Sequence, residues 1–380
     1  MASIKVLHVT QATGGIETIL LMLFRNFDRS AFEFHLACPP GTSLEASARA
    51  SGITVHGIPM VRHPDPLRDS LALMRLIRLL RKERYAIVHG HSAKGGYLAR
   101  LAARRAGGSK TVYSPQAFSF LSQRGIARYV FRWMERLAIP WTDIVAASSE
   151  SERARAIGDV GFPSNKVVVI PNSIDFDDIP NGGRTTTSGN EPKTPLVLTI
   201  GRLSYQKNCE MFVRVAARVA QQRPDVRFAI LGAGFAGPLE RKVRRLVADA
   251  ELDSRLEILP WTSKTEALEA MSRASVFVLT SRFEGMPNTL LEALMLKTPA
   301  VVTDVDGSRD VLRGGGGYVV GLDDDEAMAK QIVALISDPK AAKEMAEIGY
   351  DRARRMFDIQ HNVQTLGDVY RQIVRADNCA

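Results

Sequence analysis

The 380-residue chain contains only three cysteines, Cys38, Cys209 and Cys379. They lie far apart, with neither metal-ligand spacing nor a disulfide framework, so we expect a protein of a reducing compartment such as the cytoplasm. No stretch approaches the ~18 consecutive apolar residues of a membrane-spanning helix. The N-terminal MASIKVLHVTQATGG has one short apolar run that leads into glycines, which indicates a first strand rather than a secretory signal.

Two common nucleotide-binding motifs are also incomplete. Gly14-Gly15 is not a full dinucleotide fingerprint, and no second strand that ends in an acid completes one, so nicotinamide chemistry is not expected. The glycine run at 314–317 is not followed by the lysine of a phosphate-binding loop.

Positive charge is in excess, with 50 Lys and Arg against 41 Asp and Glu and a net charge of +9. The basic residues are dispersed and no nucleic-acid module is present, so nucleic acid is not an expected partner. Residues 71–85 and 124–139 combine Arg or Lys with apolar residues at helical spacing, which suits helices that lie on an anionic membrane surface. The same pattern fits a helix with an apolar stripe toward the core and a basic face in solvent, and the sequence leaves both readings open.

The order of apolar patterns predicts an α/β fold of two domains. A chain of 380 residues is too long for one ordinary core, and 45% hydrophobic with 24% charged residues is typical of a soluble globular protein. Strand-like runs such as IKVLHVT, FEFHLAC and AIVHGHS alternate with segments of helical period, and this alternation predicts parallel sheets covered on both faces.

The alternation stops once and then restarts. Residues 180–195 are rich in Gly, Pro, Thr and Ser, which predicts a linker, and PLVLTI then begins a second series of strands. We therefore expect a Rossmann-like domain at 1–177, a linker at 178–195 and a second such domain at 196–357. The last helix, at about 358–380, is expected to pack back onto the first domain.

Two cations follow the strand-like run PLVLTI. In GRLSYQKN (201–208), Arg202 offers a planar fork for phosphate and Lys207 a point charge, so the pair suits a diphosphate. Solvated loop cations would give the same pattern, and the motif alone does not decide between them.

Two glutamates, Glu284 and Glu292, frame the segment EGMPNTLLE. Gly285 permits a close approach of backbone to ligand, and a helix is expected to begin near Asn288 or Thr289. The free amides and the positive dipole end of that helix would make an anion site. Thr289 and Glu292 also match a capping box, in which the acid only satisfies a backbone N–H. Glu284 precedes the helix and has no such explanation.

One ligand chemistry accounts for both acids and both cations. A sugar nucleotide carries hydroxyl groups at its two ends and negative charge in its middle. Carboxylates, which only accept hydrogen bonds, would bind the hydroxyls at each end, and amides and cations would bind the diphosphate between them.

In this order, the motifs resemble the retaining glycosyltransferases of family four, of the bacterial surface-polysaccharide and lipopolysaccharide type. The resemblance covers essentially the whole chain and is carried by TGGIET, VHGHSAKGG, VVIPNSID, SRFEGMPNTLLEAL and TDVDGSRDVL. It implies the GT-B fold, in which two doubly wound, Rossmann-like domains face each other across a cleft.

The resemblance implies a role for each matching residue. Glu284 would hold hydroxyls of the donor sugar, and Arg202 and Lys207 would neutralise the departing diphosphate. Gly14 and Gly15 would form a loop beneath the sugar and diphosphate. The other implied donor-binding residues are Gly285, Met286, Pro287, Asn288, Thr289, Leu290, Glu292 beside the ribose, and Trp261 beside the base.

The chain departs from this family at one position. Many relatives place a histidine in the turn after the strand TVYS, where this chain has Gln116. Glutamine does not titrate, so a general-base role is excluded there, but it can hold a sugar hydroxyl and we keep it as a catalytic candidate. His91, at the end of the preceding strand, is a further donor-binding candidate, for which packing or hydrogen bonding is the competing explanation.

Neither a metal nor a cofactor is expected. Asp304-Val305-Asp306 resembles the Asp-X-Asp metal motif of a different glycosyltransferase fold, but Arg202 and Lys207 already supply the positive charge. We expect transfer of a hexose from a nucleoside-diphosphate sugar to a polysaccharide or lipid-linked oligosaccharide, with an α-linkage, in the cytoplasm or at the inner membrane face. A nucleotide-sugar epimerase of the same fold and a non-catalytic nucleotide-sugar-binding protein remain alternatives.

Overall fold

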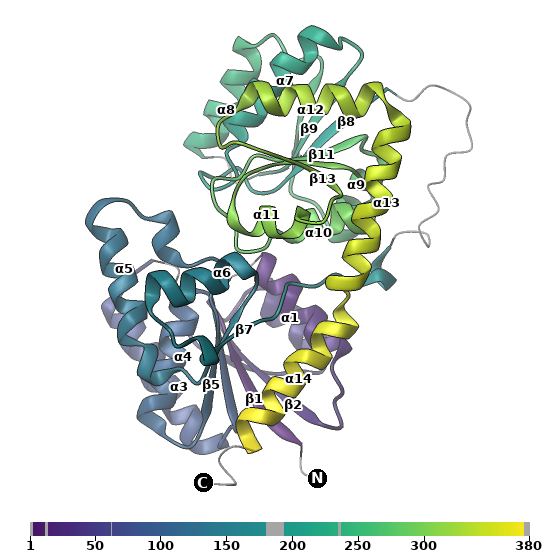
Figure 1. The fold of residues 1–380 in the computed structure, drawn as a ribbon. Helices are drawn as coiled ribbons and strands as arrows, with labels where there is room; N and C mark the ends of the chain where they lie inside the picture. Colours follow the sequence, from purple (N-terminus) through teal and green to yellow (C-terminus); the bar gives the residue numbers. More distant parts are fainter. Residues whose placement is uncertain (1–2, 12–13, 62, 180–193, 235–236, 376–380) are drawn as a thin grey trace. The chain divides into compact units, whose positions relative to one another are not determined.

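The computed structural model describes residues 3–11, 14–61, 63–179, 194–234 and 237–375, and these form two units (Figure 1). Unit 1 comprises Met1–Ser173 and Ile359–Ala380, and unit 2 comprises Ile174–Asp358. The first unit thus ends four residues before the expected position 177. Most of the expected linker, residues 180–193, lies outside the described residues.

The core of unit 1 is a parallel sheet of seven strands in the order β3-β2-β1-β4-β5-β6-β7. The strands are β1 (Ile4–Val9), β2 (Phe32–Cys38), β3 (Thr54–Gly57), β4 (Ile87–His91), β5 (Lys110–Ser114), β6 (Ile144–Ala147) and β7 (Val167–Val169). The strand order reverses between β1 and β4, and ligands of such folds bind at the carboxyl ends of the strands near this reversal.

Helices cover the sheet of unit 1. They are α1 (Gly15–Asn26), α2 (Ser43–Ala50), α3 (Pro66–Glu83), α4 (Ala93–Ala106), α5 (Gly125–Leu137), α6 (Glu150–Arg155) and α14 (Ile359–Arg375). Helix α14 comes from the far end of the chain, and its Leu366 and Tyr370 pack in one core cluster with residues of α1 and β2 (Figure 1). Short 3₁₀ or π turns lie at Ser119–Ser122, Ile139–Trp141, Ala156–Val160, Ser164–Lys166 and, in unit 2, Phe176–Asp178.

Glycine allows α4 to lie close to the sheet. A Cβ atom at Gly96 would come within 2.3 Å of the Tyr113 ring on β5, and one at Gly90 would come within 2.7 Å of the Gly96 Cα. Real Cβ atoms do not approach other atoms this closely, so larger residues at these two positions would force the helix away from the strands.

Unit 2 contains a parallel sheet of six strands in the order β10-β9-β8-β11-β12-β13. The strands are β8 (Leu196–Ile200), β9 (Arg227–Ala233), β10 (Leu256–Pro260), β11 (Val276–Leu279), β12 (Ala300–Thr303) and β13 (Gly317–Val320). The helices are α7 (Cys209–Gln222), α8 (Pro238–Asp249), α9 (Lys264–Arg273), α10 (Asn288–Met295), α11 (Asp306–Leu312), α12 (Asp325–Ser337) and α13 (Pro339–Met356). The order reverses between β8 and β11, so the loops after these two strands are neighbours.

The two basic, apolar segments fold differently. Helix α3 buries Ala72, Leu76 and Leu80, which is the core-facing stripe of an ordinary surface helix. In α5, by contrast, the one fully buried residue is Glu135. None of the described helices is long and apolar enough to cross a membrane.

A buried ion pair holds α5 against the rest of unit 1. Arg100 on α4 has no exposed surface, and its Nη2 donates to Glu135 Oε2 at 2.9 Å. The Tyr113 hydroxyl donates to the other carboxylate oxygen at 2.8 Å, and the Arg100 guanidinium stacks over the Tyr113 ring at 3.8 Å. Every polar group in this cluster therefore has a charged partner.

We expect Glu135→Ala to lower the free energy of unfolding by about 3–5 kcal/mol, because it leaves the Arg100 guanidinium buried without a counter-ion. Urea denaturation followed by circular dichroism measures this loss. Glu150→Ala, which removes an exposed acid on α6, is the control and should change stability by less than about 0.5 kcal/mol. Equal effects for the two variants would show that the buried pair contributes no more than a surface charge.

Candidate active site

Glu284 lies in the loop that joins β11 to α10, and three side chains hold it. Its Oε1 accepts hydrogen bonds from Lys207 Nζ and from Ser281 Oγ, both at 2.7 Å. Its Oε2 accepts from Gln206 Nε2 at 3.2 Å. Only 7% of Glu284 is exposed, so the carboxylate is fixed in place and largely shielded from water.

The backbone joins the loop after β8 to the loop after β11. Arg282 N donates to Gln206 O at 2.8 Å, and Thr280 Oγ1 donates to Lys207 O at 2.9 Å. These loops are neighbours because β8 and β11 pair at the reversal of the strand order. The structure therefore brings the predicted residues Lys207 and Glu284 into direct contact, although 77 positions separate them in the sequence.

The loop after β12 packs against the same segment. A Cβ atom at Gly307 would lie 2.0 Å from Gly285 O, so only glycine fits at position 307. Met286 and Pro287, which follow Gly285, are buried. The segment that carries Glu284 is thus fixed from both sides.

Helix α10 begins at Asn288, within the predicted range, and no side chain caps its first turn. Leu290 N and Leu291 N donate to Pro287 O at 3.1 and 3.3 Å, and the positive end of the helix dipole favours an anion beside this turn. Thr289 Oγ1 is buried and has no hydrogen-bond partner within the described residues, whereas Leu290 is fully buried and its side chain is apolar.

The capping-box explanation of Glu292 is wrong. The N-cap of α10 is Pro287, which has no side-chain oxygen, and Thr289 lies inside the helix. The capping box of this unit is instead in α9, between Ser263 and Glu266. Glu292 thus has no structural role at the helix end, and a ligand-binding role remains the prediction.

Burial raises the pKa of Glu292 to about 7, an effect that the nearby Asp178 increases and that Lys264 and Lys207 oppose. Lys264 Nζ itself donates to Asp178 Oδ2 at 2.6 Å, so its charge is partly neutralised. Glu292 can therefore gain or lose a proton near neutral pH.

The other two predicted residues of unit 2 lie on its surface. Arg202 is exposed in the loop after β8, and Trp261 follows β10 with 54% of its surface exposed. Trp261 N donates to Ala233 O at 2.7 Å, which fixes its backbone beside the end of β9. Nucleotide binding by these residues remains a prediction.

In unit 1, Gly14 and Gly15 start helix α1. Gly14 is its N-cap with φ +83°, a conformation that favours glycine, and Gly15 is its first residue. At the start of the helix, Glu17 N donates a hydrogen bond to Gly14 O at 2.9 Å. The predicted loop is therefore the entry to α1, directly after β1.

Gln116 lies in a strained turn after β5. Gln116 and Ala117 have φ values of +55° and +77°, which are unfavourable for residues with a Cβ atom. The buried Glu152 of α6 stabilises this turn, because its Oε1 accepts from Ala117 N at 2.7 Å. Gln116 Nε2 donates to Asn172 Oδ1 at 2.9 Å, so the amide has a fixed orientation.

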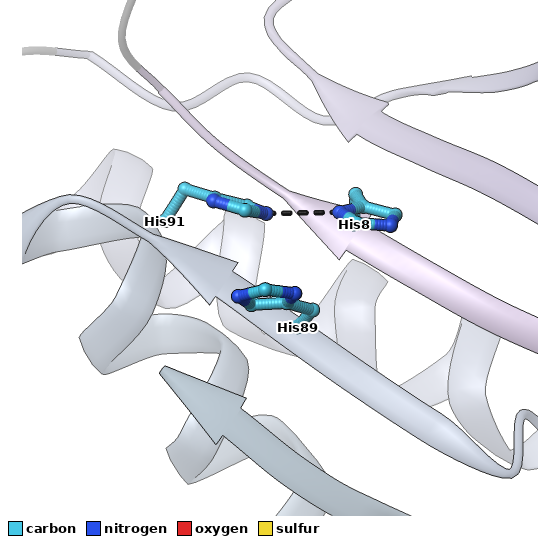
Figure 2. Close-up of side chains that lie close together, drawn as sticks. All are labelled: His8, His89 and His91. Carbon is cyan, nitrogen blue, oxygen red and sulfur yellow. Dashed lines mark hydrogen bonds between the residues drawn. The ribbon is translucent and has the colours of Figure 1, made fainter. Parts of the chain in front are cut away.

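His91 belongs to a buried group of three histidines on two adjacent strands (Figure 2). His8 on β1 is the register partner of His89 on β4, and His91 lies two residues further along the same face. His8 Nδ1 and His91 Nε2 share a hydrogen bond at 2.9 Å. Burial lowers the pKa of His91 to about 3, and it lowers the pKa of His8 and His89 far below the usual value.

The geometry of the three histidines does not suit a metal ion, although their ligand atoms lie within 4.8 Å of one another. Both ring nitrogens of His89 are already engaged, one with Tyr370 Oη at 2.6 Å and the other with Ser114 Oγ at 2.8 Å. The rings of His89 and His91 are stacked at 4.1 Å, whereas ligands of one ion point their in-plane nitrogens at it from different directions. The group is a hydrogen-bonded stack.

A cavity of about 30 Å³ adjoins this stack. His91, Gln116 and Asn172 line it, together with apolar side chains of α1 and α14. His91 Nδ1 is buried and has no hydrogen-bond partner within the described residues. The cavity is large enough for one or two water molecules or a ligand hydroxyl, which could satisfy this atom.

Asp304 and Asp306 both face Arg309. Arg309 Nε bonds Asp304, and Arg309 Nη1 lies 3.8 Å from Asp306. Asp306 is also the first residue of α11. These acids therefore stabilise the start of a helix.

Five supporting residues were not predicted from the sequence. Gln206, Ser281, Asn172 and Gly307 contact predicted residues through hydrogen bonds or backbone packing. Glu152 stabilises the turn that carries Gln116 by bonding Ala117 N. Gln206 and Ser281 lie within the recognised motifs, and a search for donors beside Glu284 could have found them. Glu152 gives no such signal, because its partner Ala117 is 35 positions away.

Two Rossmann-like units, each with polar loops at the carboxyl ends of its parallel strands, have the GT-B architecture of solved glycosyltransferases. The family model described as glycosyl transferase 4-like domain matches residues 14–173, and the model described as glycosyl transferases group 1 matches residues 186–352. The chain belongs to family four of the glycosyltransferases.

Relatives and solved structures agree with this assignment. The chain is 28% identical over 98% of both chains to the UDP-Gal:α-D-GlcNAc-diphosphoundecaprenol α-1,3-galactosyltransferase of Escherichia coli. It is 30% identical to the α-maltose-1-phosphate synthase of Mycobacterium tuberculosis, over 66% of this chain and 68% of that one. The structure of Anabaena Alr3699/HepE in complex with UDP and glucose superposes with a TM-score of 0.81 and 17% identity, over 96% of this chain and 99% of that one.

The raised pKa of Glu292 predicts a pH-dependent loss of stability. The unfolded chain releases this proton near pH 4.5 and the folded chain near 7, so stability falls as pH rises between these values. We expect Glu292→Gln to be neutral at pH 4.5 and to stabilise unit 2 by about 2 kcal/mol at pH 8, or several degrees in Tm. Differential scanning fluorimetry across this pH range measures the difference in Tm between the variant and the wild type.

The exposed Glu344 on α13 provides the matched control for this experiment. Glu344→Gln should leave Tm unchanged relative to the wild type at every pH. If the Tm difference between Glu292→Gln and the wild type stays constant from pH 4.5 to pH 8, the pKa of Glu292 is not raised.

Proposed function

We propose that the protein is a retaining glycosyltransferase that transfers a hexose from a nucleoside-diphosphate sugar to a lipid-linked oligosaccharide or a polysaccharide, with an α-linkage. One observation carries this proposal. The Glu284 carboxylate, held by Lys207 and Ser281, lies directly before the uncapped N-terminus of α10. A hydrogen-bond acceptor and the start of a helix thus follow one another along one segment, and a cation from the loop after β8 lies beside them.

The arrangement suits a donor that lies along this segment. Glu284 would accept hydrogen bonds from the sugar hydroxyls, and the amides at the start of α10 would bind the diphosphate. The buried Thr289 hydroxyl is available to a phosphate oxygen. Lys207 would neutralise the leaving group from its place beside Glu284, and Arg202 would assist from the exposed side of the loop.

Same-face substitution makes this donor site sufficient for catalysis. The bond from the anomeric carbon to the diphosphate oxygen breaks, and the acceptor oxygen forms its bond on the same face. The acceptor's proton passes to the departing diphosphate, so no general base is required. Gln116 cannot titrate and burial keeps His91 neutral, which agrees with a mechanism in which the chain mainly stabilises charge. We propose that Lys207 and Arg202 replace a metal in this role.

The acceptor class is proposed from similarity. The Escherichia coli relative acts, by its name, on a sugar linked to diphosphoundecaprenol. We propose an acceptor of the same class here, in lipopolysaccharide or exopolysaccharide synthesis. A lipid-linked acceptor lies in a membrane, and the net charge of +9 favours an anionic surface. The protein would then work as a peripheral protein at the inner face of the cytoplasmic membrane.

Product analysis with UDP-hexoses and a lipid-diphosphate-linked GlcNAc acceptor tests the reaction. We expect a disaccharide whose anomeric proton coupling in NMR shows the α configuration of the donor. A β-linked product would disprove retention. An altered nucleotide sugar formed without acceptor would identify an epimerase, and donor binding without any product would identify a binding protein.

Glu284→Gln should lower kcat/KM for transfer at least 100-fold, because the amide cannot accept hydrogen bonds in the same way and loses its ion pair with Lys207. The affinity for UDP, measured by calorimetry, should change by less than about threefold, since Glu284 is assigned to the sugar. Glu344→Gln on α13 is the exposed control. Normal turnover in the Glu284 variant would remove this residue from the site.

Replacement of Arg202 and Lys207 by Ala should weaken UDP binding by about 10- to 100-fold, because the charged hydrogen bonds of the pair to phosphate would together contribute about 1.5–3 kcal/mol. Uridine carries no phosphate, so its affinity should not change. Arg218→Ala, an exposed cation on α7, is the control. Equal losses for UDP and uridine would exclude a phosphate contact by the pair.

A further inference from the structure

We propose that the outward face of helix α5 is the surface through which this protein docks on an anionic lipid bilayer. The inference rests on the proposed function in one respect, since a lipid-linked acceptor requires that the protein reach a membrane. To the proposed function, this inference adds which surface contacts the membrane and how that surface is oriented. It also explains why α3, the other basic helix, does not bind the membrane.

The apolar residues of α5 form one exposed stripe. Ile126, Tyr129, Val130, Trp133 and Leu137 follow one another at steps of one, three and four, so they share one face of the helix. Ile126 is 82% exposed, Tyr129 65% and Trp133 58%. Val130 and Leu137 are also exposed. Contiguous apolar surface of this kind marks an interaction site.

Helix α5 leaves most of its large apolar residues on its exposed side. On its inner side, the half-buried Phe131 packs against a core cluster and Glu135 bonds Arg100 and Tyr113. An amphipathic helix normally buries the apolar side, as α3 does with Leu76 and Leu80. The buried ion pair therefore fixes the helix with its apolar stripe outward.

The charges of α5 indicate which partner covers the stripe. Its only acid, Glu135, is buried, so the exposed charges of the helix are all positive. Arg128 and Arg136 are exposed, and the Arg132 guanidinium lies 5.5 Å from the centre of the Tyr129 ring. Arginines beside Trp, Tyr and Ile suit the headgroup region of an anionic bilayer, where the cations contact lipid phosphates and the apolar side chains enter the acyl boundary.

A second copy of the chain fits this surface less well. Pairing two α5 helices through their stripes would bring two rows of arginines together without acids to neutralise them. Helix α3 also exposes Leu67 and Met74, but it carries acids, among them Asp69, and its central stripe is buried. It therefore serves as the matched control.

Vesicle flotation of the full-length protein tests the proposal. We expect binding to vesicles of phosphatidylcholine with phosphatidylglycerol at low salt, weaker binding at high salt, and little binding to phosphatidylcholine alone. Ile126→Asn with Trp133→Asn should lower the partition coefficient at least tenfold. Arg128→Gln with Arg132→Gln should remove most of the salt dependence. Leu67→Asn with Met74→Asn on α3 should stay within twofold of the wild type.

A second measurement reports the depth of α5. Brominated lipids quench tryptophan emission at the acyl boundary, so they should quench the wild type more than Trp133→Phe. No binding at low salt, or an equal loss in the α3 control, would overturn the proposal. A dimer in light scattering that the α5 variant converts to a monomer would show that a second copy covers the stripe, and would also overturn it.

The outcomes separate this inference from the proposed function. Transfer to a water-soluble, short-chain acceptor should be the same for the wild type and for the α5 variant, because α5 contributes no residue to the candidate site. Vesicle binding without transfer would leave the docking surface intact and reject the proposed reaction. Transfer without vesicle binding would reject the docking surface alone.

Discussion

The contact between Lys207 and Glu284 is the constraint on which the candidate site of unit 2 depends. A carboxylate with so little exposure is costly unless a cation and hydrogen-bond donors surround it, and Lys207, Ser281 and Gln206 meet this requirement at 2.7–3.2 Å. The same contact joins the loops after β8 and β11. Because Gly285 and α10 follow Glu284 closely in the chain, a fixed Glu284 also fixes the start of that helix.

The two units stabilise their buried polar side chains in different ways. In unit 2 the site is ionic, and the buried Glu284 carboxylate is paired with Lys207. In unit 1 the residues at the carboxyl ends of β4 and β5 are neutral, because burial keeps His91 uncharged and Gln116 bonds another amide. A neutral surface suits a sugar acceptor, which has hydroxyls and no charge at its reacting end, whereas the ionic surface suits a diphosphate.

Much of this could be predicted from the sequence, since parallel strands ending in polar loops leave a regular pattern. The α/β alternation and the start of α10 at Asn288 follow from local residues, and so does the choice of Glu284 as a candidate. The outward orientation of α5 does not. Periodicity shows that its apolar residues share a face, but which face turns inward depends on Arg100, a residue of another helix that is 35 positions from Glu135. Likewise, the sequence does not show that Glu152 stabilises the turn at Ala117, because the two residues are 35 positions apart.

The raised pKa of Glu292 would couple its protonation to the nucleotide binding that we propose. In the structure, burial favours its neutral form, and the nearby Lys264 is partly neutralised by Asp178. A bound ribose would donate hydrogen bonds to the carboxylate and stabilise its charge, and Lys207 would act in the same direction. Loss of the proton and binding of the nucleotide would then be coupled, so part of the donor's binding energy would offset the unfavourable burial of a charge that the free protein avoids.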